Sequence, residues 1–188
     1  MSGQRVLGII GFDAAGGLVA RRALDSGSTL VIHGLSCRDE RDLSSLRAER
    51  GGDASGSAPV AAGRSGPSIL LVSSLSDLVA ALPRPRALLL DLGALRPSRR
   101  EAGAGRAASP EAIVAETLGL LEEGDLLMTC AGADCAQATS FAERCAKGGF
   151  RFVDLGVSGG KGRFAGVVVA AGGSEADCAF AQGFFGSG

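Results

Sequence analysis

The N-terminal part of the chain joins an apolar run, a glycine turn and an amphipathic segment. The apolar run Arg5–Ile10 has the length of a strand, and Leu18–Leu24 has the pattern of an amphipathic helix. Between them lies G-F-D-A-A-G-G, from Gly11 to Gly17. In a G-x-G-x-x-G turn the first glycine makes the bend, the second lets the backbone approach a pyrophosphate, and the third lets the helix pack on the strand. The segment therefore predicts a dinucleotide-binding turn.

Asp13 stands at the second glycine position of this turn, whereas Gly11 and Gly16 keep the first and third. Its carboxylate would oppose a pyrophosphate: at an effective dielectric near 20, like charges about 4 Å apart repel by ~4 kcal/mol, roughly a thousandfold in affinity. Alternatively, Asp13 caps the helix and accepts the hydrogen bonds that a phosphate would otherwise take. We favour this capping role over a working cofactor turn. The turn residues that would contact a cofactor are Gly11, Phe12, Ala14, Ala15 and Gly16.

Apolar runs of strand length alternate with helical patterns along the rest of the chain. Further strands are expected at 29–33, 68–72, 87–92, 125–129, 150–155 and 167–171. Helices are expected at 37–49, 76–82, 110–124, 136–147 and from 174 onward, and Ser109 and Pro110 suit the start of the third. This alternation predicts a Rossmann-type α/β fold, a doubly wound and mostly parallel sheet with helices on both faces. We expect a single domain over 1–188, with low-complexity surface insertions near 51–66 and 96–108.

Composition excludes several classes of function. The net charge of −1 gives no attraction to nucleic acid or to an anionic membrane surface. No apolar stretch approaches the ~20 residues that span a bilayer, and the first strand begins almost at once, so we expect a cytoplasmic protein without a secretory signal. The five cysteines include no C-x-x-C pair, which argues against a zinc site and against a disulfide framework. We therefore expect no metal.

Several segments, in order, are close to those of a known family. The segment 75–86 resembles "S-L-E-E-L-V…L-K-x-P-R", and 120–125 resembles "L-L-E-K-G-D". Residues 152–160, F-V-D-L-G-V-S-G-G, are similar to "F-L-D-V-G-V-S-G-G", and Gly166 with Gly172-Gly173 matches "G…L-M-V-G-G". These are segments of the NADP-binding domain of the decarboxylating 6-phosphogluconate dehydrogenases, which belong to the β-hydroxyacid dehydrogenase superfamily. The resemblance covers nearly the whole chain apart from the two insertions.

The resemblance implies a place in an oxidoreductase lineage of the pentose phosphate pathway. Members of the family oxidise and decarboxylate 6-phosphogluconate and reduce NADP. Ser158, Gly159 and Gly160 match the family's substrate-contacting motif, so 6-phosphogluconate or a related phosphorylated sugar acid is the implied substrate. A tight turn after a strand would also explain this Ser-Gly-Gly sequence.

Several cofactor contacts of the family are replaced in this chain. The "V-P-A-G" loop aligns with Leu92–Leu95 and keeps only Ala94. The asparagine of "D-G-G-N-S" is replaced by Gly132, and the "N-R" that reads the 2′-phosphate of NADP aligns with Gly34-Leu35. Arg38 lies just beyond and is the candidate for that phosphate contact. An acid at this point, which would bind the ribose of NAD, is also missing.

Two functions from different classes stay open. The family's catalytic lysine and glutamate lie in a helical portion beyond the nucleotide domain, so we assign no catalytic residue and expect no turnover by the chain alone. The first hypothesis is a 6-phosphogluconate dehydrogenase-like NADP-binding domain. The second is a non-catalytic Rossmann module that serves binding or protein interaction. We also expect the apolar segment 179–185 to be partly uncovered, which would favour self-association or a helical partner domain.

Overall fold

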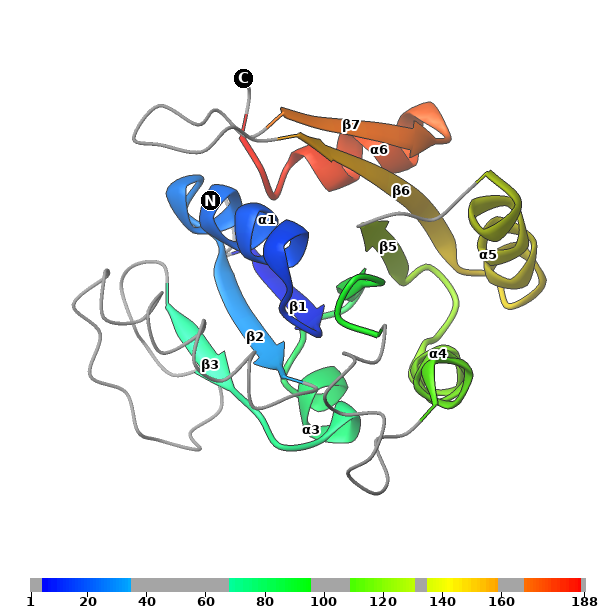
Figure 1. The fold of residues 1–188 in the computed structure, drawn as a ribbon, viewed down its shortest axis with the longest axis horizontal. Helices are drawn as coiled ribbons and strands as arrows, with labels where there is room; N and C mark the ends of the chain where they lie inside the picture. The colour runs from blue at the N-terminus through cyan, green and yellow to red at the C-terminus, as the bar shows by residue number, and fades with distance from the viewer. Residues whose placement is uncertain (1–4, 35–67, 96–108, 131–134, 159–167, 187–188) are drawn as a thin grey trace.

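The computed structural model describes residues 5–34, 68–95, 109–130, 135–158 and 168–186. In this part of the chain the strands form one sheet in the order β3-β2-β1-β4-β5-β6-β7 (Figure 1). All neighbouring pairs are parallel except β6 and β7, which are antiparallel. The strands are β1 (Val6–Ile10), β2 (Thr29–His33), β3 (Ile69–Leu71), β4 (Ala87–Asp91), β5 (Leu126–Cys130), β6 (Arg151–Ser158) and β7 (Val168–Gly173). The predicted Rossmann-type fold is confirmed.

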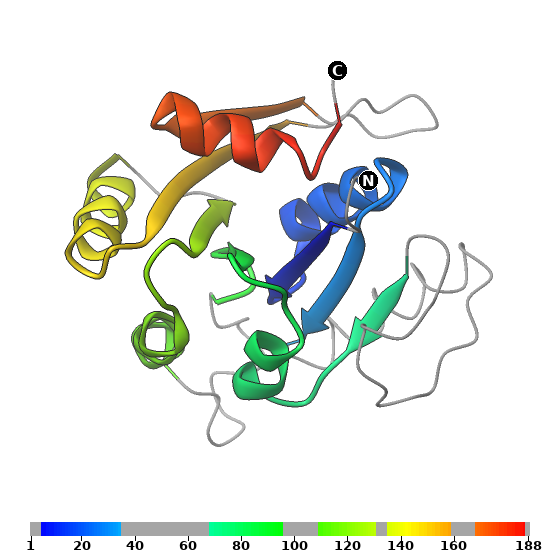
Figure 2. The ribbon, with the colours of Figure 1, turned by 180° about the vertical axis from the view of Figure 1, so that it is seen from behind.

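Helices cover both faces of the sheet. The described helices are α1 (Ala14–Asp25), α3 (Leu75–Ala80), α4 (Pro110–Leu120), α5 (Cys135–Lys147) and α6 (Glu175–Gln182). Side chains of α1 and α6 belong to one buried cluster, and side chains of α3, α4 and α5 belong to the other. Figures 1 and 2 show these two groups on opposite sides of the sheet.

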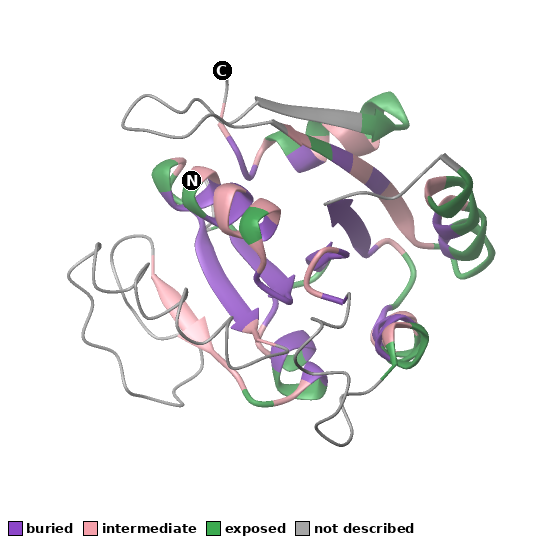
Figure 3. Cartoon of the chain, in the orientation of Figure 1, coloured by how far each residue is buried: buried purple, intermediate pink, exposed green. Residues whose placement is uncertain are grey.

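The central strands are buried on both faces (Figure 3). Along β4, Ala87 and Leu89 face the α1 side, whereas Leu88 and Leu90 face the side of α3, α4 and α5. A strand between two helical layers has no solvated face, so its sequence is a continuous apolar run rather than an alternation. This explains why strand positions could be read from short apolar runs.

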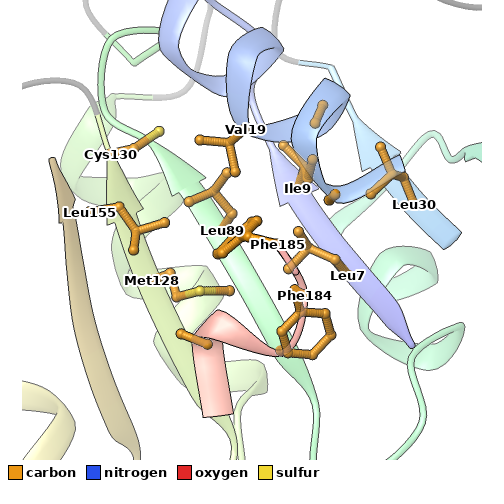
Figure 4. Close-up of a cluster of buried hydrophobic side chains, with 14 of the residues drawn as sticks. Leu7, Ile9, Val19, Leu30, Leu89, Met128, Cys130, Leu155, Phe184 and Phe185 are labelled. Atoms are coloured by element: carbon orange, nitrogen blue, oxygen red, sulfur yellow. The ribbon is translucent and has the colours of Figure 1, made fainter. Parts of the chain in front are cut away.

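The expectation of an uncovered C-terminal apolar segment is wrong for two of its three phenylalanines. Phe184 and Phe185 are buried, at 6% and 5% exposure. They follow α6 and lie among the side chains of β1 and β4, such as Leu7 and Leu89 (Figure 4). Ala179 is exposed and Phe180 is half-buried, so the segment is partly uncovered at its start, and self-association or a helical partner stays a prediction.

Helix boundaries follow from capping. The Ser109 hydroxyl accepts the Ala112 N–H at 3.2 Å and Pro110 is the first residue of α4, as predicted. The same helix ends at Leu120 rather than at Gly124. Arg86 donates to the Leu120 carbonyl at 3.3 Å, and the Asp125 carboxylate accepts the Glu122 N–H at 2.9 Å. These contacts satisfy backbone groups that would otherwise continue the helix.

Most other predicted elements are confirmed with shifted ends. The strand expected at 150–155 continues to Ser158, and the one expected at 167–171 is β7, whose antiparallel direction was not foreseen. The predicted helix 37–49 and the insertions at 51–66 and 96–108 lie outside the described residues. None of the described helices is long and apolar enough to cross a bilayer.

Candidate functional site

The candidate site lies at the carboxyl ends of β1 and β4, which are neighbours in the sheet. The chain adds β2 and β3 on one side of β1 and β4 to β7 on the other, so the connections diverge here. Ligands of open α/β sheets bind in the crevice at such a switch point. Gly11 turns the chain out of β1 with a φ of 77°, a left-handed conformation that favours glycine, and its N–H donates to the His33 carbonyl at 2.9 Å.

Asp91, the last residue of β4, fills this switch point. It is fully buried, with 0% of its surface exposed. Its Oδ2 accepts the N–H of Asp13 at 2.7 Å and the N–H of Gly16 at 3.1 Å. Its Oδ1 accepts the N–H of Gly93 at 3.0 Å. Both carboxylate oxygens therefore accept from backbone N–H groups, two of which open α1. A negative charge at a helix N-terminus is also stabilised by the helix dipole.

The prediction that the Asp13 side chain caps α1 is wrong. Asp13 occupies the N-cap position of α1 with extended backbone, at φ −98° and ψ −170°, but its side chain makes no capping hydrogen bond. It donates its own N–H to Asp91 instead. The capping carboxylate comes from the neighbouring strand. The helix begins at Ala14 rather than at Leu18, because Asp91 accepts N–H groups at the start of the turn segment.

The glycine at the third turn position is explained by the same carboxylate. A Cβ built on Gly16 would lie 2.4 Å from Asp91 Oδ2, closer than nonbonded atoms can approach. A Cβ on the adjacent Gly17 would meet only the Phe12 ring, at an ordinary 3.6 Å. Gly16 therefore gives Asp91 room to reach the start of α1.

The structure brings together most of the predicted cofactor residues. Gly11, Ala14, Ala15 and Gly16 lie in or next to the turn from β1 to α1. Ala94 lies in the turn after β4, where its N–H donates to the Asp91 carbonyl at 3.1 Å. The Phe12 side chain is not at the site, since it is 4% exposed and packed in the core beneath α1.

The structure describes only one of the predicted phosphate and substrate residues, Ser158. Arg38, Gly159 and Gly160 lie outside the described residues. Ser158 is the last residue of β6 and pairs with Val168 of β7. Since β4, β5 and β6 are parallel neighbours, Ser158 ends its strand at the same edge of the sheet as Asp91.

Burial and neighbouring charge shape the electrostatics of the site. The pKa of Asp91 is raised, chiefly because the carboxyl group is buried. The N–H groups of Asp13, Gly93 and Gly16 lower this pKa, and the charge of Asp13 raises it further. Cys130 of β5 is the register partner of Asp91. Burial, the charges of Asp91 and Asp154 and a hydrogen bond with Asp91 raise the pKa of this thiol far above its usual range. Cys130 therefore stays protonated beside Asp91.

Asp91 is the site residue that sequence reasoning missed. It is the next-to-last residue of the run A-L-L-L-D-L, which predicts only a strand. The available signal was a carboxylate at the end of a strand expected to be buried, because charged groups in such positions need partners. Its partners could not be named without the order of the strands.

A cleft of about 620 Å³ lies between α4 and α5, on the opposite face of the sheet. Leu92, Leu95, Val114 and Phe141 form its apolar part and belong to the cluster on the side of α3, α4 and α5. The Cys130 side chain belongs to the other cluster, as do the core residues beneath α1. Leu92 and Leu95 also flank Gly93 and Ala94, so the cleft borders the turn after β4.

Comparison with known proteins supports this assignment of the fold. Residues 105–187 match the NAD binding domain of 6-phosphogluconate dehydrogenase. The matched stretch is less than half of the 188 residues; it includes α4, α5 and α6 but not the glycine turn. A search of curated proteins gave no match. The partial match and the sheet topology agree on a Rossmann-type fold of the kind that NAD-binding domains have.

Solved structures share the fold at low sequence identity. The 6-phosphogluconate dehydrogenase of Plasmodium falciparum is 16% identical with a TM-score of 0.67, over 95% of this chain and 33% of that one. The 3-hydroxyisobutyrate dehydrogenase of Salmonella typhimurium is 18% identical with a TM-score of 0.62, over 97% of this chain and 53% of that one. A reductive aminase of Aspergillus terreus is 18% identical with a TM-score of 0.57, over 98% and 53%. The chain thus spans about half, or less, of these proteins.

Proposed function

We propose that the chain is a 6-phosphogluconate dehydrogenase-like NADP-binding domain that does not oxidise substrate on its own. The observation that carries this proposal is the meeting of two turns at the switch point. The turn after β1 supplies Gly11 and Gly16, and the turn after β4 supplies Ala94. Folds of this type hold a dinucleotide at this edge, with its pyrophosphate at the start of the first helix.

The choice of NADP and of a phosphorylated sugar acid rests on the sequence motifs and on the superfamily. The Plasmodium enzyme was solved in complex with its cofactor NADP+ and with its substrate 6-phosphogluconate. In this chain the corresponding candidates are Arg38 for the 2′-phosphate and Ser158–Gly160 for the sugar acid. No residue of this sequence matches the family's lysine base or glutamate acid, so we assign no catalytic residue.

The second candidate is a non-catalytic Rossmann module for binding or protein interaction. Asp91 favours it, because the N–H groups of Asp13 and Gly16 are satisfied without any ligand. A domain in this state is folded and capped with no cofactor in place. The two candidates therefore differ in whether a dinucleotide binds at all.

Isothermal titration calorimetry with NADP, NADPH and NAD separates the two candidates. For the NADP-binding domain we expect saturable but weak binding, with an NADP dissociation constant well above micromolar and a preference for NADP over NAD. An absence of heat for every dinucleotide, at ligand concentrations in the millimolar range, would instead support the interaction module. In both cases we expect no NADPH formation from 6-phosphogluconate by the pure chain. A steady rise in NADPH absorbance proportional to protein concentration would refute the non-catalytic part of the proposal.

A further inference from the structure

Two backbone donors at the start of α1, the helix end that faces a pyrophosphate in folds of this type, already contact Asp91. At the start of α1, the N–H groups of Asp13 and Gly16 both point to Oδ2 of this side chain. We propose that Asp91 is an autoinhibitory group, an intramolecular carboxylate that takes the place of the pyrophosphate and has to leave before a dinucleotide binds. This inference rests on the proposed NADP-binding function and adds a control element to the same site.

The geometry leaves no room for both anions. Asp91 Oδ2 is 3.1 Å from the Gly16 nitrogen, and it lies where even a Cβ on Gly16 would be 2.4 Å away. Each N–H group has one hydrogen to donate, and a second anion within hydrogen-bond reach of it would be repelled by the carboxylate. Occupation of the N–H groups by Asp91 and by a phosphate is therefore mutually exclusive.

The contacts of Asp91 couple the two turns of the site. The same side chain that caps α1 also accepts the Gly93 N–H at 3.0 Å in the turn after β4. That turn carries Ala94, whose N–H donates to the Asp91 carbonyl. Release of the carboxylate would free the donors of α1 and the Gly93 N–H in one step. Asp91 thus holds both halves of the cofactor site in their ligand-free arrangement.

Neighbouring groups adjust how strongly Asp91 is held. The Asp13 charge lies close enough to raise the pKa of Asp91, so the two carboxylates disfavour each other. Cys130 of β5 offers a protonated thiol as a further hydrogen-bond partner. The first turn of α1 contains no acidic residue that would repel Asp91. Within the part of the chain that the structure describes, backbone donors rather than a cation hold the carboxylate.

The test compares Asp91→Ala with Asp13→Ala. Both variants lose one carboxylate at the switch point, but only the first vacates the N–H groups of α1. The probes are NADP and inorganic pyrophosphate in calorimetric titrations, with circular dichroism and thermal melting as checks of folding. Removing a charged hydrogen-bonding competitor should tighten binding of both probes to Asp91→Ala by ~10- to 100-fold over wild type. Asp13→Ala should gain at most about fivefold.

The outcomes separate this inference from the proposed function. If Asp91→Ala is folded but binds pyrophosphate no better than wild type does, the autoinhibitory role is wrong. If Asp91→Ala gains pyrophosphate affinity while NADP binds no tighter than pyrophosphate, the autoinhibitory contact holds and the NADP-binding function fails. If NADP binds wild type and Asp91→Ala equally well, the function holds and the inference fails.

Wild-type protein provides a second measurement that does not depend on the folding of a variant. Amide resonances of Asp13, Gly16 and Gly93 should shift together as pyrophosphate is added, because all three N–H groups exchange Asp91 for another partner. Shifts of Asp13 and Gly16 without Gly93 would show that the two turns are not coupled. If none of the three resonances shifts at saturating pyrophosphate, pyrophosphate does not take the place of the Asp91 carboxylate, and the inference is wrong.

Discussion

Asp91 Oδ2 lies 2.7 Å from the backbone nitrogen of Asp13 and accepts its N–H, although both residues carry carboxylates. The contact joins the last residue of β4 to the N-cap position of α1. It is favourable because the backbone of Asp13 donates while the Asp13 side chain stays half-exposed. The dinucleotide turn of this chain is thus held by a side chain from the adjacent strand.

Gly16→Ala should destabilise the domain, whereas Gly17→Ala should not. A Cβ at position 16 would overlap Asp91 Oδ2 and force the carboxylate off the start of α1. We expect a loss of about 1–3 kcal/mol in the free energy of unfolding, as for other overpacked buried sites. At position 17 the Cβ meets only ordinary contacts, and an alanine within a helix should add about 0.5–1 kcal/mol.

Urea denaturation of the two alanine variants beside wild type measures both effects. Equal stability changes at positions 16 and 17 would contradict a specific clash with Asp91.

Replacement of Asp91 should change how stability depends on pH. Burial raises the pKa of Asp91 above its ordinary value of 3.8 in the folded chain. The folded state therefore holds this proton more tightly than the unfolded state does. Its contribution to stability is fully present below the unfolded pKa and is lost as the pH rises through the folded pKa.

Thermal melting of wild type and Asp91→Asn across the mildly acidic range tests this sign. Relative to Asp91→Asn, wild type should lose stability as the pH rises through this window. A gain of stability with rising pH in wild type relative to the variant would mean that the backbone donors outweigh burial. Asp13 and Cys130 face the same carboxylate, so both are kept unchanged in the comparison.

The fold could be predicted from the sequence because its signals are local. Strands buried on both faces give apolar runs such as 87–91, and caps such as Ser109 mark where helices begin. The ends of elements were less predictable when distant residues decide them. For example, α4 stops at Leu120 because Arg86 and Asp125 bind the backbone there.

The site was harder to predict than the fold for a related reason. The glycine turn identified the switch point, but the identity of the capping carboxylate depends on which strand lies beside β1. Asp91 is far from Asp13 in sequence and becomes its neighbour only through the β1–β4 pairing. The sequence has a carboxylate within the turn, Asp13, and so predicts Asp13 as the cap of α1. The carboxylate that caps the helix is the distant Asp91.

Cys130 and Cys145 should resist alkylation in the folded protein. Burial raises the pKa of Cys145 to about 11, and the thiol of Cys130 titrates higher still. Because the thiolate is the reactive form, both side chains should be inert near neutral pH. Cys178 is half-buried and should react first among these three.

Timed iodoacetamide labelling followed by peptide mass spectrometry measures the order of reaction. Protein unfolded in urea serves as the control, in which all three thiols should label at similar rates. Fast labelling of Cys130 in the folded state would show that the strand edge beside Asp91 opens readily.

Asp13→Gly should improve dinucleotide affinity only modestly. This change restores the glycine of a G-x-G-x-x-G turn and removes a negative charge, but it leaves Asp91 on the N–H groups of α1. Because the Asp13 side chain is half-exposed and makes no capping hydrogen bond, solvent screens its charge. A gain of about fivefold or less in NADP affinity is therefore expected.

Calorimetry with Asp13→Asn as the matched control separates the effect of charge from that of side-chain volume, because asparagine keeps the shape of aspartate. A gain as large as that of Asp91→Ala would mean that Asp13, rather than Asp91, is the main obstacle to the pyrophosphate.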